Sequence, residues 1–205
     1  RLVLNTTEST DDPIIFPKTL QINEGKKLSI KNYKGLYVLK PKNGGSSVGV
    51  KIVKGQNTIP LKNEFKWTDL MAEEFVGSME LTVTVLRDKP LCVTEIKAAQ
   101  NEEFYNYKAK YDRNGSIHEI PAKIPRQLYE QAMSWALRAH KIVGCKGISR
   151  SDFRYDKIND QLYMLEINTQ PGMTETSLSP EQALCCNISL SEMVKIIIEE
   201  ASYEC

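Results

Sequence analysis

Residues 165–174 contain the side chains whose types and spacing point most directly to chemistry. They follow a short apolar run that predicts a strand, on which successive side chains point to opposite faces. Glu166 and Asn168 would therefore share one face. Leu165 and Ile167 would point into the packing. Oxygen-bearing side chains at the end of a buried strand are costly unless something binds them, and Mg²⁺ prefers oxygen ligands of this kind.

A second polar pair, Arg150 and Asp152, lies two positions apart on another expected strand. Residues 155–160, between the two strands, are typical of a hairpin turn, so the strands should be antiparallel neighbours. Asp152 would then converge with Glu166 and Asn168 on one cation, with Arg150 beside them for an anionic group. A strand capped by a polar turn and an isolated surface salt bridge are the simpler alternatives, but four polar groups aimed at one place favour the cation site.

Two glycine-containing turns are candidates for binding anions. Gly172, in the turn that follows Asn168, would take a conformation that other residues avoid and expose backbone N–H groups. Residues 43–50 join two expected strands and are rich in glycine and serine, so their N–H groups and hydroxyls would surround phosphate oxygens beside the positive charge of Lys40. The segment lacks the Gly-x-x-x-x-Gly-Lys-Ser pattern of a Walker loop, and a mobile turn is the commoner role for such a hairpin.

Two further segments carry groups suited to a nucleotide. Residues 70–76 predict a strand that ends in acidic and apolar groups, where Glu73 and the backbone near Val76 would hydrogen-bond a purine; a plain strand end is the alternative. Residues 104–111 combine three tyrosines with two lysines. Basic and aromatic residues together are able to bind nucleic acid, but the near-neutral charge of the chain favours an active-site lid or an exposed loop.

The remaining pattern indicates an α+β protein. Alternating residues over 80–86 and 91–96, joined by a turn, predict a β-hairpin. Apolar residues at steps of three and four over 125–142 predict a helix that ends at Gly144. A capping box that starts at Ser189 predicts the beginning of the last helix. Further strands are expected at 14–22, 35–40 and 48–53.

Composition places the chain among ordinary globular proteins. Of its 205 residues, 41% are hydrophobic and 26% are charged, and the formal net charge of +1 gives no electrostatic case for nucleic acid or an anionic membrane. No apolar run approaches the roughly 20 residues that span a bilayer. The five cysteines are an odd number without a Cys-x-x-Cys motif, which argues against a disulfide framework or a zinc site and favours a reducing cytoplasm.

The order of these motifs strongly resembles bacterial D-alanine–D-alanine ligases of the ATP-grasp superfamily. Any one motif is weak, but six in the family's order and spacing are specific, and the resemblance runs from about Tyr37 to the C-terminus. The matching stretches are residues 39–41 with 45–50, 73–75 with 80–83, 104–111, 144–147 with 150–153, 166–174, and 177–178.

The resemblance implies two lobes, each with a mainly antiparallel sheet and packed helices, and ATP between them. Residues 1–76 would form part of the smaller lobe, with the phosphate loop, and residues 77–205 the larger lobe, with the lid, the metal site and the last helix. The implied ATP contacts are Lys40, Ser46, Ser47, Glu73, Glu74, Phe75, Val76, Glu80, Phe104, Lys110 and Leu165. The implied ligands of two Mg²⁺ ions, with Mn²⁺ as an alternative, are Asp152, Glu166 and Asn168. The implied substrate contacts are Tyr111, Arg150, Gly172, Ser177 and Leu178, and the implied catalytic residues are Ser46, Lys110, Tyr111, Arg150 and Gly172.

The activity implied by the resemblance is the ATP-dependent joining of two D-alanines through an acyl phosphate, for peptidoglycan precursor synthesis in the cytoplasm, by a protein that is a homodimer at full length. No nucleic acid or membrane partner is expected. A D-alanine–D-lactate ligase is the runner-up, although depsipeptide ligases generally lack a tyrosine at the position of Tyr111. A non-catalytic nucleotide-binding module is the alternative from another class. The family's N-terminal substrate domain and a phosphate-binding lysine before the central lobe are not recognisable, so these residues alone are not expected to ligate D-alanine efficiently.

Overall fold

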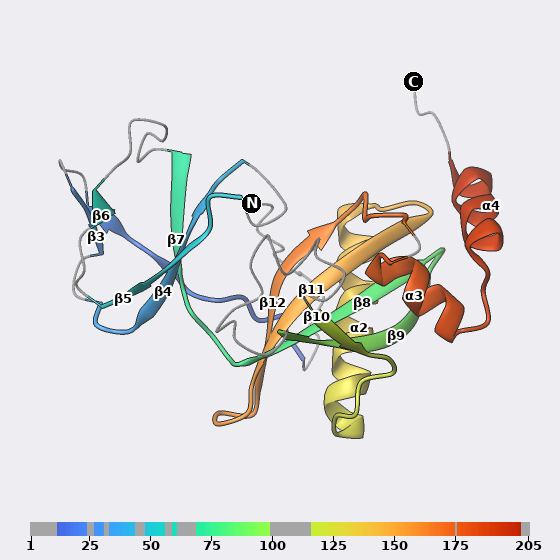
Figure 1. The fold of residues 1–205 in the computed structure, drawn as a ribbon, viewed down its shortest axis with the longest axis horizontal. Coiled ribbons are helices and arrows are strands. Elements are labelled where there is room, and N and C mark those ends of the chain that lie inside the picture. Colours follow the sequence, from blue (N-terminus) through green and yellow to red (C-terminus); the bar gives the residue numbers. More distant parts are fainter. Residues whose placement is uncertain are drawn as a thin grey trace. The chain divides into compact units, whose positions relative to one another are not determined.

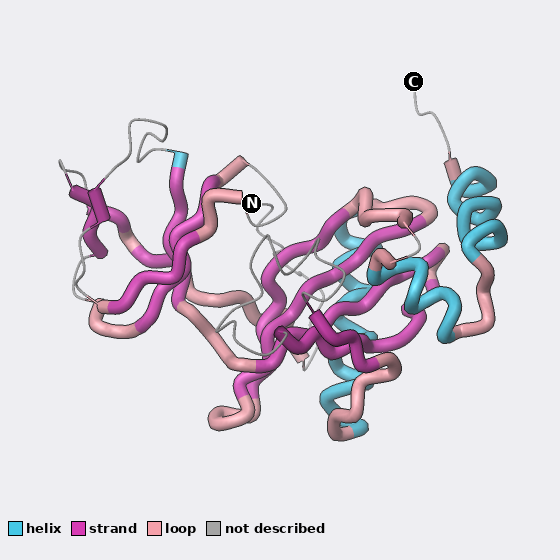
Figure 2. Tube along the Cα trace, in the orientation of Figure 1, coloured by secondary structure: helices cyan, strands magenta, loops and turns pink. Residues whose placement is uncertain are grey.

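A computed structural model of the chain describes residues 12–23, 27–30, 33–43, 48–55, 59–60, 69–98, 116–174 and 176–201. These residues form two compact units, coloured along the chain in Figure 1 and by secondary structure in Figure 2. The smaller unit takes its described residues mainly from Pro17–Val76. The larger unit takes them from Gly77–Lys97 and from Ser116 onward, together with residues 12–16.

The smaller unit is built on antiparallel strands. Its main sheet has the order β1-β7-β4-β5, and a second sheet has the order β2-β3-β6. Alternate residues of β4, Tyr37 and Leu39, are buried in the core of this unit with Ala72 of β7 and Val53 of β5. The strands are β1 Thr19–Leu20, β2 Ile22–Asn23, β3 Lys27–Ile30, β4 Leu36–Pro41, β5 Lys51–Lys54, β6 Ile59–Pro60 and β7 Leu70–Glu74.

The larger unit contains a five-stranded sheet in the order β10-β9-β8-β11-β12. The neighbours β9–β8, β8–β11 and β11–β12 pair antiparallel. Alternate residues of β8, Leu81, Val83 and Val85, belong to the core, so Glu80 and Thr82 turn to the opposite, polar face. The strands are β8 Met79–Leu86, β9 Lys89–Ala98, β10 Ser116–Glu119, β11 Ile148–Asp156 and β12 Gln161–Asn168.

Helix α2 (Arg126–Val143) packs on the apolar face of this sheet (Figure 1). Its buried side chains recur at steps of one, three and four residues, which gives the helix one apolar side. Trp135 on that side is wholly buried and lies in one cluster with Leu81, Phe153 and Met164 of the sheet. The core of the larger unit therefore lies between α2 and the sheet, and the polar face remains for other contacts.

Two further helices follow the sheet in sequence. Helices α3 (Leu178–Cys185) and α4 (Leu190–Glu200) form a second cluster, in which Ala183 and Met193 meet Leu86 at the end of β8. In the part of the chain that the structure describes, no helix is both long enough and apolar enough to cross a membrane.

Several expected elements are confirmed. The strand expected at 35–40 is β4, and the expected hairpin is formed by β8 and β9. Helix α2 ends at Gly144, which takes the left-handed conformation with a φ of 71°. Ser189 caps α4, since its hydroxyl accepts a hydrogen bond from the Glu192 N–H at 3.2 Å. In each case a residue typical of a turn or a helix cap lies next to a periodic pattern of apolar residues, so the local sequence was sufficient to predict the element.

The strand expected over 14–22 is wrong for its first half. Strand pairing begins only at Thr19, and residues 14–16 pack instead against the core of the larger unit. The Met164 N–H donates to the Ile15 carbonyl at 2.8 Å. This segment therefore belongs with the larger unit, contrary to the expected division at residue 76, because three neighbouring apolar side chains are partly buried against the larger core.

Candidate active site

A β-bulge in β12 determines which side chains reach the polar face of the larger sheet. Asp152 lies opposite Glu166 and Phe153 lies opposite Met164, so Leu165 is left as an extra residue. An extra residue shifts the alternation of a strand by one position. The expectation of a regular strand is therefore wrong here: Met164 is buried, Leu165 is the bulged residue, and Glu166 faces away from the core.

Four polar residues consequently lie on one face of β11 and β12. Asp152 is directly opposite Glu166, and Arg150 is directly opposite Asn168. Ile167, between the two polar residues of β12, packs against the core on the other side. Residues directly opposite in an antiparallel pair have their Cβ atoms roughly 4.5–5.5 Å apart. The structure thus brings together the four side chains that the sequence predicted to converge.

Arg150 and Asp152 form a two-pronged ion pair. Arg150 Nε lies 2.9 Å from Asp152 Oδ1, and Nη2 lies 3.0 Å from Oδ2. The Thr82 hydroxyl donates a further hydrogen bond to Asp152 Oδ1 at 2.7 Å. Both charged side chains are largely shielded from water, with exposed fractions of 15% and 19%. The salt bridge expected as the simpler alternative is thus formed, and it holds the guanidinium on the same face as the carboxylates.

Glu166 and Asn168 are held less tightly. The Glu166 side chain is exposed, and Asn168 Oδ1 accepts a hydrogen bond from the Gln170 N–H at 3.0 Å. Together with Asp152 they offer only oxygen donors, which is the ligand set that suits Mg²⁺. Among the described residues, no group of three or more His, Cys, Asp or Glu side chains is placed to hold a metal ion. The predicted metal site therefore depends on two carboxylates and one amide.

Glu80, expected at the ribose, is held by Arg154, which lies directly across from it on β11. Arg154 Nη1 lies 3.0 Å from Glu80 Oε1, and Nη2 donates to the Gly77 carbonyl at 3.0 Å. Burial lowers the pKa of Arg154, and the charge of Glu80 opposes that shift. Sequence reasoning missed Arg154, although it continues the alternating series of Arg150 and Asp152 along the polar face.

In the smaller unit, Lys40 of β4 and Glu73 of β7 form an ion pair. The distance between Lys40 Nζ and Glu73 Oε2 is 2.5 Å, and Glu73 is only 2% exposed. A carboxylate that is buried to this degree needs a partner, and Lys40 provides it. The residue predicted to contact phosphate and the residue predicted to contact adenine therefore lie on the same face of one sheet.

The residues that follow Glu73 use their backbone inside the smaller unit. The Glu74 N–H donates to the Lys18 carbonyl and the Phe75 N–H donates to the Leu36 carbonyl, each at 3.0 Å. Adenine contacts at Glu74 and Phe75 would therefore involve their carbonyls or side chains and not these N–H groups. Val76 ends the segment and is buried.

The turn that contains Gly172 comes close to the start of α3. Gly172 does not take a left-handed φ, so the expected special conformation is wrong. A Cβ at this position would lie 2.8 Å from Ser177 Oγ, and this close approach is what favours glycine. Ser177 Oγ in turn accepts a hydrogen bond from the Thr174 N–H at 3.2 Å and bonds the Thr174 hydroxyl at 2.7 Å. Leu178 begins α3, and the first N–H groups of a helix have no partner within it.

Five predicted site residues lie outside the described part of the chain, and the expectations for the phosphate loop and the lid therefore stay predictions. They are Ser46, Ser47, Phe104, Lys110 and Tyr111.

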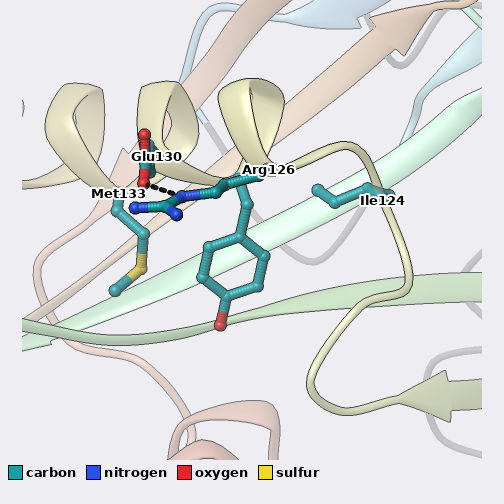
Figure 3. A pocket seen from close by; sticks show the side chains of 5 residues that line it. Ile124, Arg126, Glu130 and Met133 are labelled. Carbon is teal, nitrogen blue, oxygen red and sulfur yellow. Dashed lines mark hydrogen bonds and ion pairs between the residues drawn. The ribbon is translucent and has the colours of Figure 1, made fainter.

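A surface hollow beside the start of α2 contains none of the candidate residues. It is lined by Ile124, Arg126, Tyr129, Glu130 and Met133. Figure 3 shows Arg126 and Glu130, one helical turn apart, joined by an ion pair of 2.7 Å between exposed side chains. The Tyr129 hydroxyl accepts a hydrogen bond from the Val93 N–H at 3.0 Å, which ties α2 to the sheet. We therefore assign the hollow to the packing of α2 and not to catalysis.

Comparison with known proteins supports the resemblance. The family model described as D-ala D-ala ligase C-terminus matches residues 19–199. The D-alanine–D-alanine ligase of Gluconobacter oxydans is 45% identical over 168 residues, which cover 80% of this chain and 55% of that protein. The chain thus spans about half the length of the curated relatives that it matches.

Solved structures agree at the level of the fold. The D-alanine–D-alanine ligase of Bacillus anthracis matches with a TM-score of 0.63 and 33% identity over 80% of this chain and 54% of that one. A structure of the B. anthracis ligase complexed with ATP matches with a TM-score of 0.66 and 25% identity, over 91% and 60%. The expected α+β, ATP-grasp fold is confirmed. Because the family model covers most of the residues, the chain belongs to the D-alanine–D-alanine ligase family, in the part that the model describes as the C-terminus.

Proposed function

We propose that the protein to which these residues belong joins two D-alanines at the expense of ATP, giving D-alanyl-D-alanine, ADP and phosphate for peptidoglycan precursors in the cytoplasm. The observation that carries this proposal is the set Arg150, Asp152, Glu166 and Asn168 on one face of β11 and β12, in a chain of this family. The names of the curated relatives support the reaction, and the ATP complex of a solved relative supports the nucleotide.

Charged side chains in each of the two units suit different parts of a nucleotide. Glu73, a buried carboxylate, suits the amino group of adenine, and its ion pair with Lys40 orients the ammonium that would contact phosphate. Glu80 suits the ribose hydroxyls, because Arg154 fixes the direction of its carboxylate. The remaining proposed ATP contacts are Ser46, Ser47, Glu74, Phe75, Val76, Phe104, Lys110 and Leu165.

Asp152, Glu166 and Asn168 would hold two Mg²⁺ ions, or Mn²⁺, through their side-chain oxygens. When bound, such ions offset the negative charge of the phosphoryl groups during transfer. Thr82 and Arg150 hold the Asp152 carboxylate in place from two directions. The protein's own contribution is therefore a fixed oxygen ligand beside a fixed guanidinium.

The proposed reaction has two steps. A carboxylate oxygen of the first D-alanine attacks the γ-phosphorus of ATP, the bond to ADP breaks, and an acyl phosphate forms. The amine nitrogen of the second D-alanine then attacks the acyl carbon, the bond to the phosphate oxygen breaks, and the nitrogen loses a proton as phosphate leaves.

Arg150 and the Gly172 N–H would stabilise the oxyanion that develops on the acyl carbon during the second step. Ser177 and the Leu178 N–H would hold the carboxylate of the second D-alanine. From the lid, Lys110 would reach the γ-phosphate and Tyr111 would hydrogen-bond Ser46; the closed lid would exclude the water that otherwise hydrolyses the acyl phosphate.

The test is phosphate release by the full-length protein with ATP, Mg²⁺ and D-alanine, with the product identified by mass spectrometry. D-Lactate and D-serine are offered as competing acceptors, and Glu166→Gln serves as a variant that should fold but not turn over. D-Alanyl-D-alanine as the main product supports the proposal. A preference for D-lactate would mean that the second substrate is D-lactate and not D-alanine. ATP binding without phosphate release under any condition would overturn the enzymatic function. Sedimentation of the same sample tests the proposed homodimer.

A further inference from the structure

Gln182 of α3 is a wholly buried polar residue that the proposed reaction does not use. Its side-chain oxygen accepts a hydrogen bond from the Thr84 N–H at 2.7 Å. Its side-chain nitrogen donates to the Thr82 carbonyl at 3.2 Å and to the Thr94 hydroxyl at 2.9 Å. Every contact pairs a donor with an acceptor, and all three partners belong to the neighbouring strands β8 and β9.

The position of this amide coincides with an irregularity in the sheet. Opposite residues of β8 and β9 shift register between Val83 and Val85, so Thr84 has no partner residue on β9. A buried backbone N–H without a partner is unfavourable. The Gln182 side chain supplies the missing partner, and the Ser179 hydroxyl bonds the Thr84 hydroxyl at 2.9 Å as a second link.

The same strand connects Gln182 to the candidate active site. Thr82, whose carbonyl accepts from Gln182, donates its hydroxyl to Asp152 Oδ1 at 2.7 Å. At the other end, α3 starts at Ser177 and Leu178, the residues to which the proposal assigns the carboxylate of the second D-alanine. Hydrogen bonds through Thr82 thus link Gln182, four residues after the first residue of α3, to Asp152 of the ion pair.

We propose that Gln182 is a positioning residue for the acceptor D-alanine: by fixing α3 on β8, it sets where Ser177 and the Leu178 N–H lie relative to the Arg150–Asp152 pair. This inference rests on the proposed function. A helix of eight residues is not stable without tertiary contacts, so α3 takes its place from what it contacts. Gln182 therefore acts through Leu178 and Ser177 and does not touch the substrate.

The experiment compares Gln182→Leu and Gln182→Glu with the unchanged full-length protein. Leucine keeps the approximate volume and removes all three hydrogen bonds, whereas an ionised glutamate keeps an acceptor and loses the donor. Initial rates are measured against D-alanine and resolved into the KM values of the first and second D-alanine. The expected result for Gln182→Leu is an acceptor KM at least tenfold higher, with the KM of ATP and the kcat at saturating D-alanine changed less than threefold.

The pH profile gives a second readout. Burial raises the pKa of a carboxyl, so raising the pH ionises the glutamate of Gln182→Glu and removes the donor for the Thr82 carbonyl; its acceptor KM should rise with pH from near the unchanged value, whereas that of Gln182→Leu should be high throughout. Gln161→Leu is the matched control, because among the described residues its side-chain nitrogen bonds only the adjacent Leu162 carbonyl, at 2.9 Å. An acceptor KM that is unchanged in Gln182→Leu, or equal losses for both D-alanines and ATP, overturns the positioning role.

Exchange of the Thr84 amide with solvent, followed by NMR without substrates, separates this inference from the proposed function. Gln182→Leu should exchange at least tenfold faster at Thr84, and equal exchange rates would overturn the hydrogen-bond network itself. If Gln182→Leu exchanges faster at Thr84 but the unchanged protein does not ligate D-alanine, the hydrogen-bond network stands, and the positioning role and the proposed function are both overturned. If Gln182→Leu does not fold, Ser179→Ala replaces it, and it must raise the acceptor KM two- to threefold for the role to stand.

Discussion

Asp152→Asn and Glu166→Gln remove the same charge from two directly opposite residues, yet they should differ in their effect on stability. Asp152 accepts hydrogen bonds from Arg150 and Thr82 and is 19% exposed as a side chain. Glu166 is exposed, and no hydrogen bond or ion pair joins its side chain to another described residue. Removal of the first charge breaks an organised cluster, whereas removal of the second does not.

The size of the difference follows from the contacts. A hydrogen bond to a charged group contributes roughly 1.5–3 kcal/mol to stability. An asparagine at 152 keeps one acceptor oxygen, but its NH₂ group faces the guanidinium of Arg150, which is only 15% exposed and loses the charge of the Asp152 carboxylate. We expect Asp152→Asn to lower the free energy of unfolding of the larger unit by about 2 kcal/mol, roughly a 30-fold change in the folding equilibrium. Glu166→Gln should stay within about 0.5 kcal/mol, as surface substitutions usually do.

Urea unfolding followed by tryptophan fluorescence measures this difference. Trp67 and Trp135 are the two tryptophans of the chain, so a Trp67→Phe background leaves Trp135, buried in the core of the larger unit, as the reporter. Equal losses for the two variants, or a larger loss for Glu166→Gln, would refute the ion-pair cluster as the source of stability.

The same two variants test the proposed metal ligands. Each should raise the Mg²⁺ concentration needed for ATP binding, because each removes a negative charge from the proposed site and leaves one side-chain oxygen as a ligand. Calorimetric titration of ATP at several Mg²⁺ concentrations gives the dependence. If ATP binding by a variant depends on Mg²⁺ as it does in the unchanged protein, the substituted residue is not a metal ligand.

Three further predictions concern stability, each measured by urea unfolding. Gly77→Ala should cost about 3 kcal/mol, because Gly77 has a φ of 59° and a Cβ there would lie 2.6 Å from the Tyr155 carbonyl, whereas Gly144→Ala, with a φ of 71° and open space around it, should cost about 1 kcal/mol. Burial lowers the pKa of His140, so the unfolded chain binds the proton more readily and stability should fall as the pH drops below the ordinary value of 6.5; His140→Gln should reduce that fall, and an unchanged pH slope would contradict this. Ser189→Ala should cost about 1 kcal/mol through the lost cap of α4, and no loss would show that the cap is replaced by water.

The antiparallel pairing that brings the four polar residues near one another was predictable, because it depends on local signals. The turn at 157–160 makes β11 and β12 neighbours, and the spacing of two residues puts Arg150 with Asp152, and Glu166 with Asn168, on one face. The length of the turn sets the register only as far as Phe153 and Met164; the bulge at Leu165 is needed to place Glu166 opposite Asp152 and Asn168 opposite Arg150. Hairpins and strand alternation require nothing from the rest of the chain, which is why the sequence was enough for the pairing of the two strands and for the spacing within each polar pair.

Features that depend on distant contacts could not be predicted in the same way. Leu165 has no property that marks it as a bulge; the bulge follows from the need to bury Met164 and expose Glu166 on the same strand. Residues 14–16 have the pattern of a strand, but the core of the larger unit binds them in an irregular conformation. Gln182 is one of several polar residues in a short helix, and its role depends on a register shift between two strands far from it in sequence.

The placement of Asp152 directly opposite Glu166 has an electrostatic cost, because like charges opposite each other destabilise an antiparallel pair. Arg150 offsets part of this cost by its ion pair with Asp152, and the Thr82 hydroxyl offsets more by its hydrogen bond. Glu166 receives neither of these contacts, and its side chain is exposed to solvent. A divalent cation between the two carboxylates would remove the remaining repulsion. Glu166 would bind it without giving up a contact to Arg150 or Thr82. The two carboxylates therefore differ in role: Asp152 is fixed in place by its neighbours, and Glu166 remains available to bind a cation.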